Sequence, residues 1–334
     1  MDLAGVLSHL SIANLEELSH RDTACRDAVH TELYLRPRRM LTRFVANTDR
    51  FFRVIDDKAV ISGSFALYFV EGPTYWEAND LDVYTTFDGF ASVVRYLVEV
   101  EGYTENEVER TARQRMDALR RQVHQELVAR LRAGQRVYVP RDIDTGICRV
   151  TTLYKGERRV DVIRNRSASP TFAITKFWST AQMNFISSRG FCCAYPRMTC
   201  RKVAVLNPNV LSPEGRPYDF VRHLTVKYQD RGFEFFDKWF QEEELGCLGF
   251  HWHALCPTLL RRFGDAHCLC GTFGNDPTSA AFGYSDELAV SEWEVGWQLG
   301  GWHGCKGARV DSHASCWNRV TDESEDAANL DDSD

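Results

Sequence analysis

The chain has 334 residues, enough for one large domain or two smaller ones, and its 44% hydrophobic and 26% charged residues are typical of a globular protein. Twenty phenylalanines and eight tryptophans exclude disorder over most of the length, and no apolar segment approaches the roughly 20 residues that span a bilayer. The formal net charge of −7 comes from the C-terminal stretch TDESEDAANLDDSD, which holds seven acids and no Lys or Arg, so the neutral body excludes strong steering toward nucleic acid.

Apolar spacing and turn residues predict alternating helices and strands in the first third of the chain. In order, these are helical segments over 11–50, a β-branched strand at 58–62, a helix at 64–71, an alternating strand at 81–86 and a helix at 90–100. We expect a break at Arg36-Pro37, because proline interrupts the hydrogen bonding of a helix interior. Ser64 is expected to cap the helix that follows the first strand.

The remaining elements continue this mixture of helices and strands. They are a long amphipathic helix over 105–133, a strand at 137–139, two strands at 148–154 and 158–163, and helices over 171–187 and 217–240. Lys155-Gly156-Glu157 lies between the two paired strands and predicts a hairpin turn. After Gly246 the periodicity is lost and Gly, Cys, His and Trp accumulate. The order of elements predicts an α+β fold, a mixed sheet flanked by helices with further helical additions.

Two aspartates stand one residue apart in the stretch KAVISGSFALYFVEGPTYWEANDLDVY, residues 58–84. Side chains at positions i and i+2 of a strand point to the same face. Asp80 and Asp82 therefore present their carboxylates together, while Leu81 and Val83 face the core. Carboxylate oxygens are the ligands that Mg²⁺ prefers, and two such ions stabilise the attacking and leaving oxygens of an in-line displacement at phosphorus.

A third carboxylate and a phosphate-binding turn complete the pattern. Asp161 lies between two valines in the segment RRVDVI, on the second strand of the predicted hairpin. Gly63-Ser64 would present backbone N–H groups and a hydroxyl at a helix start, where nucleotide phosphates bind. A rival pair at Asp142-Ile143-Asp144 follows Pro140-Arg141 and lacks a preceding Gly-Ser turn, so we rank it lower. The alternative interpretation is solvated carboxylates beside a capping serine, although aspartate is disfavoured inside strands.

These residues resemble a known family. The blocks ISGSFALYFV, NDLDVY and VDVI are similar to the nucleotidyltransferase fold of the DNA polymerase β-like superfamily, which includes poly(A) polymerases, oligoadenylate synthetases and small antitoxin-type nucleotidyltransferases. The resemblance implies that Gly63 and Ser64 hold a triphosphate. It also implies that Asp80 and Asp82 bind the catalytic metals and that Asp161 completes the triad, as a metal ligand and as base for the attacking hydroxyl. The segments FWSTAQMNFIS, FCCAYPRMT and KYQDRGFE are also similar to a group of uncharacterised fungal proteins.

The resemblance also implies a division of the chain. Asp82 and Asp161 lie far apart in the sequence, so we expect a helical insertion at about 88–134 within a nucleotidyltransferase-like core of 51–190. The other expected units are an N-terminal helical segment at 1–50, a C-terminal helical and Cys/His/Trp-rich region at 191–320, and an acidic disordered tail at 321–334. Lys176, in the helix expected after the third carboxylate, is where related enzymes often place a cation near the nucleotide phosphates.

A metal-dependent nucleotidyltransferase is the function that the resemblance implies. We expect transfer of a nucleoside monophosphate from an NTP, for example ATP, to a hydroxyl of RNA, protein or a small molecule, with Mg²⁺ or Mn²⁺ held by Asp80, Asp82 and Asp161. The alternative is a catalytically inactive module of the same fold that binds a nucleotide or a protein partner. We expect no membrane partner and a cytoplasmic location, with a nuclear one also open, because no secretory signal is present. The base preference and the oligomeric state stay open.

Arginine and cysteine are each concentrated in one region. Nine arginines and two acids between residues 110 and 141 indicate a basic helix face, for which we favour solvent exposure over contact with nucleic acid. Eleven cysteines without a secretory signal indicate free thiols in a reducing compartment. The zinc candidates of the C-terminal region are His251, His253, Cys256, His267, Cys268, Cys270, His303, Cys305, His313 and Cys316. Because their spacing is irregular, we favour core packing of the cysteines, and a structural zinc is the alternative.

Overall fold

A computed structural model defines most of the chain up to residue 107 and a large part of the remainder. It describes residues 3–107, 145–207, 216–236 and 261–274, with the shorter pieces 110–111, 115, 125, 132, 210–211, 276, 278–283 and 296–297. The long helix predicted over 105–133, the strand at 137–139 and the rival Asp142-Ile143-Asp144 lie largely or wholly outside these residues.

Four helices precede the first strand. They are α1 (Leu3–Leu7), α2 (Ile12–Ser19), α3 (Thr23–Leu41) and α4 (Thr48–Ile55). Side-chain oxygens of Ser11, Asp22 and Asn47 accept backbone N–H groups at the starts of α2, α3 and α4, as N-caps do. The predicted break at Arg36-Pro37 is wrong, because α3 continues through Pro37. Leu33, Pro37 and Leu41 are buried along α3, so packing of this face against the core overrides the helix-breaking preference of proline.

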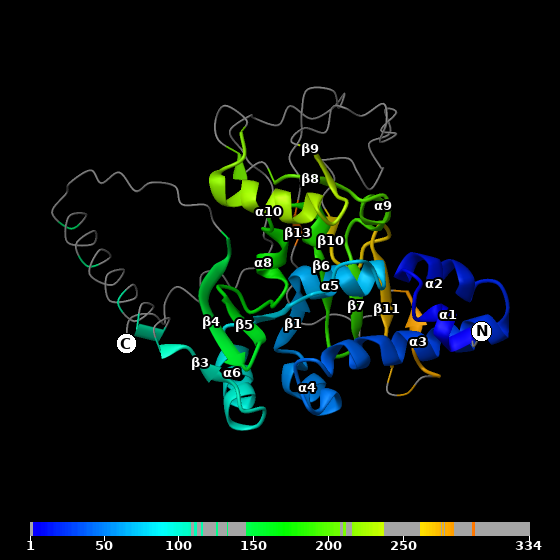
Figure 1. The fold of residues 1–334 in the computed structure, drawn as a ribbon, viewed down its shortest axis with the longest axis horizontal. Coiled ribbons are helices and arrows are strands. Elements are labelled where there is room, and N and C mark those ends of the chain that lie inside the picture. Colours follow the sequence, from blue (N-terminus) through cyan, green and yellow to red (C-terminus); the bar gives the residue numbers. More distant parts are fainter. Residues whose placement is uncertain are drawn as a thin grey trace.

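A nine-stranded mixed sheet forms the centre of the molecule, in the order β12-β11-β7-β6-β1-β2-β5-β4-β3 (Figure 1). The strands are β1 (Ala59–Ser62), β2 (Asp80–Thr85), β3 (Thr104–Glu105), β4 (Ile147–Lys155), β5 (Arg158–Asn165), β6 (Asn184–Ile186), β7 (Gly190–Cys193), β11 (Leu269–Thr272) and β12 (Ala281–Phe282). Within this sheet β2 and β5 pair in parallel, and the other described neighbours pair antiparallel. The sheet therefore continues past residue 190, where the C-terminal region was expected to begin.

The two faces of the sheet bury separate sets of side chains. Leu81, Val83 and Val160 belong to the cluster that also contains apolar residues of α2, α3 and α4, and of α5 (Gly63–Glu71) and α6 (Gly89–Glu99). Tyr84 and Ile163 belong to the cluster on the opposite face, with residues of the short helix α8 (Phe172–Thr175). By the alternation of a strand, residues 80, 82 and 161 lie on this second face. The α+β class is thus confirmed, with helices flanking a large mixed sheet.

Smaller elements follow the first part of the sheet. They are the 3₁₀ helix η1 (Thr180–Gln182), α9 (Pro196–Cys200), α10 (Asp219–Gln229) and the strands β8 (Val203–Val205), β9 (Glu234–Phe236), β10 (Arg261–Arg262) and β13 (Gly296–Trp297). β8 pairs with β9 in parallel and β10 pairs with β13 antiparallel. No helix in the described residues is long and apolar enough to cross a bilayer.

Two predicted helices are wrong in part, and one hairpin is right. Residues 171–187 form α8, η1 and strand β6 in place of one helix, because β6 inserts between β1 and β7 and its backbone joins their hydrogen bonds. The helix predicted over 217–240 ends at Gln229, and the chain turns at Gly232, with φ of +89°, into β9. The hairpin of β4 and β5 is confirmed, with Gly156 at φ +60° in its turn.

Candidate functional site

The turn from β1 into α5 lies directly against the two neighbouring aspartates. Gly63 has a positive φ of +65°, and a Cβ atom at this position would overlap Oδ2 of Asp82. The Ser64 hydroxyl donates to Oδ1 of Asp80 at 3.0 Å. Ser64 therefore bonds an aspartate of β2 and does not cap α5, whose N-cap position is Ser62 without a side-chain capping bond. The Gly-Ser turn is thus in contact with both aspartates of β2.

Strand register places the third aspartate beside the second. Asp82 is opposite Ser62 on one side and opposite Asp161 on the other, and Asp80 is opposite Arg159. Neighbouring strands lie about 4.8 Å apart, and residues i and i+2 of one strand about 6.6 Å apart. The three carboxylates therefore leave the same face of two adjacent strands.

Asp82 is the most perturbed carboxyl group of this set. Burial is the largest cause that raises its pKa, from 3.8 to about 8, and the negative charges of Asp80 and Asp161 raise it further. The positive charges of Arg159 and Lys227 act in the opposite direction. Its carboxylate accepts no hydrogen bond from the described part of the chain. A cation bound beside Asp82 would offset these negative charges and lower the pKa of Asp82.

Asp161 is held by an ion pair that the sequence interpretation missed. Arg159 donates from Nη2 to Oδ2 of Asp161 at 2.7 Å and from Nε to Oδ1 at 3.3 Å. The Asp161 side chain is buried and the guanidinium is half exposed. The segment RRVDVI contains the signal for this pair, because residues 159 and 161 of one strand share a face.

Helix α10 brings two further residues into range of the carboxylates. Lys227 lowers the pKa of Asp82 through its positive charge. Burial raises the pKa of Tyr228, and the charges of Asp82 and Asp80 add to this effect. The amide of Gln182 donates to the Tyr228 hydroxyl, which fixes α10 against η1. Tyr228 is far from all three aspartates in the sequence, so no local sequence signal could have placed α10 here.

Lys176 follows α8 and is packed in the interior. Its Nζ lies 4.4 Å from the centroid of the Phe172 ring, and its Cδ lies 3.2 Å from the position that a Cβ of Gly146 would take. Its predicted role as a phosphate-binding cation stays a prediction. Arg159 and Lys227 are cations whose charge acts on Asp82 in the structure.

The carboxylates fit a divalent metal by chemistry, although they are not drawn tightly together. Among the described residues, the group of three metal-binding side chains whose ligand atoms lie within 4.8 Å of one another consists of cysteines, and the three aspartates are not gathered that closely. Hard oxygen donors on one face, among them an Asp82 carboxylate that accepts no hydrogen bond from the described residues, are nevertheless the type of ligand that Mg²⁺ and Mn²⁺ prefer.

The basic helix and most of the zinc candidates fall largely outside the described residues. Of the ten His and Cys candidates, His267, Cys268 and Cys270 are described. Cys268 and Cys270 lie beside Cys192, a cysteine that the spacing argument did not include. A scan against protein-family models and searches of curated proteins and of solved structures found no match to this chain.

Proposed function

We propose that this chain is a nucleotidyltransferase that moves a nucleoside monophosphate from an NTP to a hydroxyl acceptor. One observation carries the proposal: the Gly63-Ser64 turn packs against Asp80 and Asp82, and strand register sets Asp161 beside them. A helix start beside paired carboxylates combines a binding place for phosphate oxygens with ligands for the cation that phosphate chemistry needs.

The turn and the start of α5 are the phosphate-binding part of this proposal. The first N–H groups of a helix have no partner within the helix, and the N-cap residue Ser62 makes no side-chain capping bond to α5. The helix dipole adds a partial positive charge at the same end. The Ser64 hydroxyl donates its one hydrogen to Asp80 and so positions this carboxylate, while the backbone N–H groups of the turn would bind the phosphates. The absence of a side chain at Gly63 leaves room for Oδ2 of Asp82 directly against the turn.

The aspartates are the cation-binding part. Asp80, Asp82 and Asp161 would hold Mg²⁺ or Mn²⁺, which when bound would neutralise charge developing on the transferred phosphate. Asp161 must share its oxygens with Arg159, because both are engaged in the ion pair. An arginine released from this pair is well placed to contact phosphate oxygens, which it binds bidentately. RNA, protein and small-molecule hydroxyls all remain acceptors consistent with this site.

A transfer assay tests the proposal. Labelled NTPs are incubated with the full chain, Mg²⁺ or Mn²⁺ and a panel of RNA, protein and small-molecule acceptors. Asp80→Ala/Asp82→Ala should reduce labelled product by about 100-fold or more, the scale on which removal of charge-stabilising groups acts. Asp88→Ala is the matched control, because Asp88 is an exposed acid just beyond β2 whose side chain makes no capping bond. Product that persists at the wild-type rate in the double variant contradicts the proposal.

A non-catalytic module that binds a nucleotide is the second candidate. It is favoured by the Arg159–Asp161 pair, which already occupies the third carboxylate, and by the loose spacing of the three aspartates. The two functions differ in their response to Asp161→Asn, which keeps the shape of the side chain. An enzyme should lose transfer by about 100-fold. A binding module should keep its nucleotide Kd within about twofold, and the wild type should bind NTP without transfer to any acceptor.

A further inference from the structure

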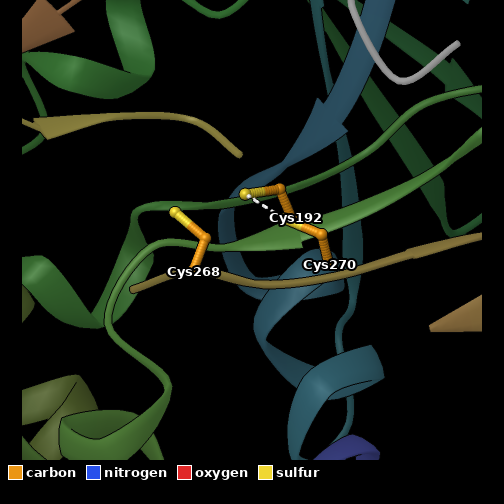
Figure 2. A group of neighbouring side chains, drawn as sticks. All are labelled: Cys192, Cys268 and Cys270. Carbon is orange, nitrogen blue, oxygen red and sulfur yellow. Dashed lines mark hydrogen bonds between the residues drawn. The ribbon is translucent and has the colours of Figure 1, made fainter. Parts of the chain in front are cut away.

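Three cysteines from two distant segments meet on the same face of the sheet as the aspartates. Cys192 of β7 is the register partner of Cys270 of β11, and their Sγ atoms are 3.2 Å apart. Cys268 precedes Cys270 by two residues, so its side chain leaves on the same side (Figure 2). All three sulfurs lie within 4.8 Å of one another. Cys192 is distant in sequence from the other two, which is why regular spacing failed to reveal the group.

A buried cation lies against this group. The Arg261 side chain is 1% exposed, and its Nη2 donates to Sγ of Cys268 at 3.5 Å. Asp265 anchors the guanidinium with bonds of 2.6 and 3.0 Å, and the carbonyl of Ala194 accepts a further bond at 2.8 Å. A guanidinium fixed beside a sulfur stabilises negative charge on that sulfur, and the thiolate is the form that binds metal. Apolar packing of cysteines requires no such partner.

We propose that Cys192, Cys268 and Cys270 bind one zinc ion. Zn–S bonds of about 2.3 Å in a tetrahedral site set the sulfurs roughly 3.8 Å apart, which small side-chain rotations reach from the observed positions. Binding releases the three thiol protons to solvent and forms three Zn–S bonds without any change of oxidation state. Cys268 is partly exposed, so a water molecule completes the tetrahedron from that side.

The ion would fasten β11 to β7 and would stand apart from the aspartate site. Cys192 and Cys270 pack in the same side-chain cluster as Tyr84 and Ile163, which adjoin the aspartates along β2 and β5. In the sheet order, however, β7 is three strands away from β2, or about 15 Å. The zinc is therefore expected to stabilise the sheet and to take no part in phosphate chemistry.

Metal content of matched variants tests the inference. The full chain, purified with reductant and loaded with zinc, is measured by elemental analysis, and Co²⁺ replacement reports thiolate ligands through a sulfur-to-cobalt absorption band. Cys192→Ala and Cys268→Ser should each lower the zinc content by about one ion per chain and weaken the cobalt band. Cys193→Ala is the matched control, since Cys193 is equally buried on the same strand but belongs to the cluster on the opposite face.

Zinc bound by other cysteines and histidines of the chain is the same in both variants, so the difference between them reports the site at Cys192. Equal zinc content in Cys192→Ala and Cys193→Ala overturns the inference. A disulfide between Cys192 and Cys270 in zinc-loaded protein kept under reductant also overturns it. Should the variants fail to fold, alkylation of the wild type gives an independent result. Zinc should protect Cys268 from alkylation, and it should not change the alkylation of Cys25, which is also partly exposed. Equal modification of Cys268 with zinc and with chelator contradicts the proposal.

Discussion

Gly63 lies where the backbone turns from β1 into α5, and two separate features restrict this position to glycine. Its φ of +65° is a conformation that other residues adopt at a cost, and Oδ2 of Asp82 occupies the space of a Cβ atom. The second feature joins the Gly-Ser turn to Asp82. A substitution here therefore disturbs both halves of the site at once.

Gly63→Ala should destabilise the protein more than alanine at another glycine with positive φ. Gly102 has φ of +74° and no heavy atom within 4 Å of the position that a Cβ would take, so Gly102→Ala measures the backbone cost alone, about 1–2 kcal/mol. The clash with Asp82 should add roughly 1–3 kcal/mol. Chemical denaturation of both variants measures the difference in the free energy of unfolding. Equal losses would show that Asp82 does not fill the space beside Gly63.

Asp82→Asn should stabilise the metal-free protein, and increasingly so as the pH rises. The pKa of Asp82 is raised from 3.8 to about 8, so the folded state holds an extra proton between these values. The free-energy cost of ionising Asp82 in the folded state is therefore absent below pH 4, grows through this window and is complete above about pH 8. Between pH 5 and 8.5 the advantage of the variant should grow by at least about 1.4 kcal/mol, the equivalent of one pKa unit.

Thermal or chemical unfolding in the presence of a chelator measures this change. Asp88→Asn removes a carboxylate from the exposed surface and serves as the control, with an advantage that stays flat across the same pH range. A flat profile for Asp82→Asn as well would show that neither burial nor the charges of Asp80 and Asp161 raise the pKa of Asp82 in the folded state.

At the scale of elements, tertiary contacts determined the secondary structure of two segments against their local preference. Asn184–Ile186 lies in a segment with helical apolar spacing, yet it forms β6, because β1 and β7 offer unpaired backbone groups on both sides. Pro37 lies inside α3 although proline disfavours a helix interior. The neighbouring Arg36 is buried and donates to Glu32 at 2.8 Å and to the carbonyl of Leu7 at 2.9 Å, which fixes this part of α3 against α1.

The elements with strong local signals were predicted correctly. The hairpin of β4 and β5 has alternating side chains and a glycine in its turn, and both signals act over a few residues. The helix α5 and the strand β2 were likewise expected close to their observed bounds. Ser64 is the exception within them, because its hydroxyl bonds Asp80 of the next strand in place of its own helix.

At the scale of the whole molecule, strands from both halves of the chain share one core. Phe191 of β7 is fully buried, and its ring centroid lies 5.2 Å from that of Phe69 in α5 and 6.2 Å from that of Phe273, which follows β11. Segments near residues 69, 191 and 273 thus stabilise one another. Loss of β7 or β11 would expose the cluster that supports the Gly-Ser turn.

Phe191→Ala should cost about 3–5 kcal/mol of the free energy of unfolding, as for other fully buried aromatic side chains. Phe220→Ala is the control, because Phe220 is 49% exposed on α10 and should cost less than about 0.5 kcal/mol. Denaturant unfolding followed by tryptophan fluorescence compares the two. Similar small costs would mean that β7 and its neighbours do not belong to the same core as α5.

The sequence by itself determined the mixed α+β class, the hairpin and the alternation that sets Asp80 and Asp82 on one face with Leu81 and Val83 on the other. These properties depend on backbone sterics and on side-chain periodicity within a few residues. The tertiary structure alone decided that Asp161 pairs in register with Asp82. It also decided that Cys192 meets two cysteines from a distant segment of the chain. Such contacts depend on which strands become neighbours. The order of the strands is determined by the apolar area that the whole sheet buries.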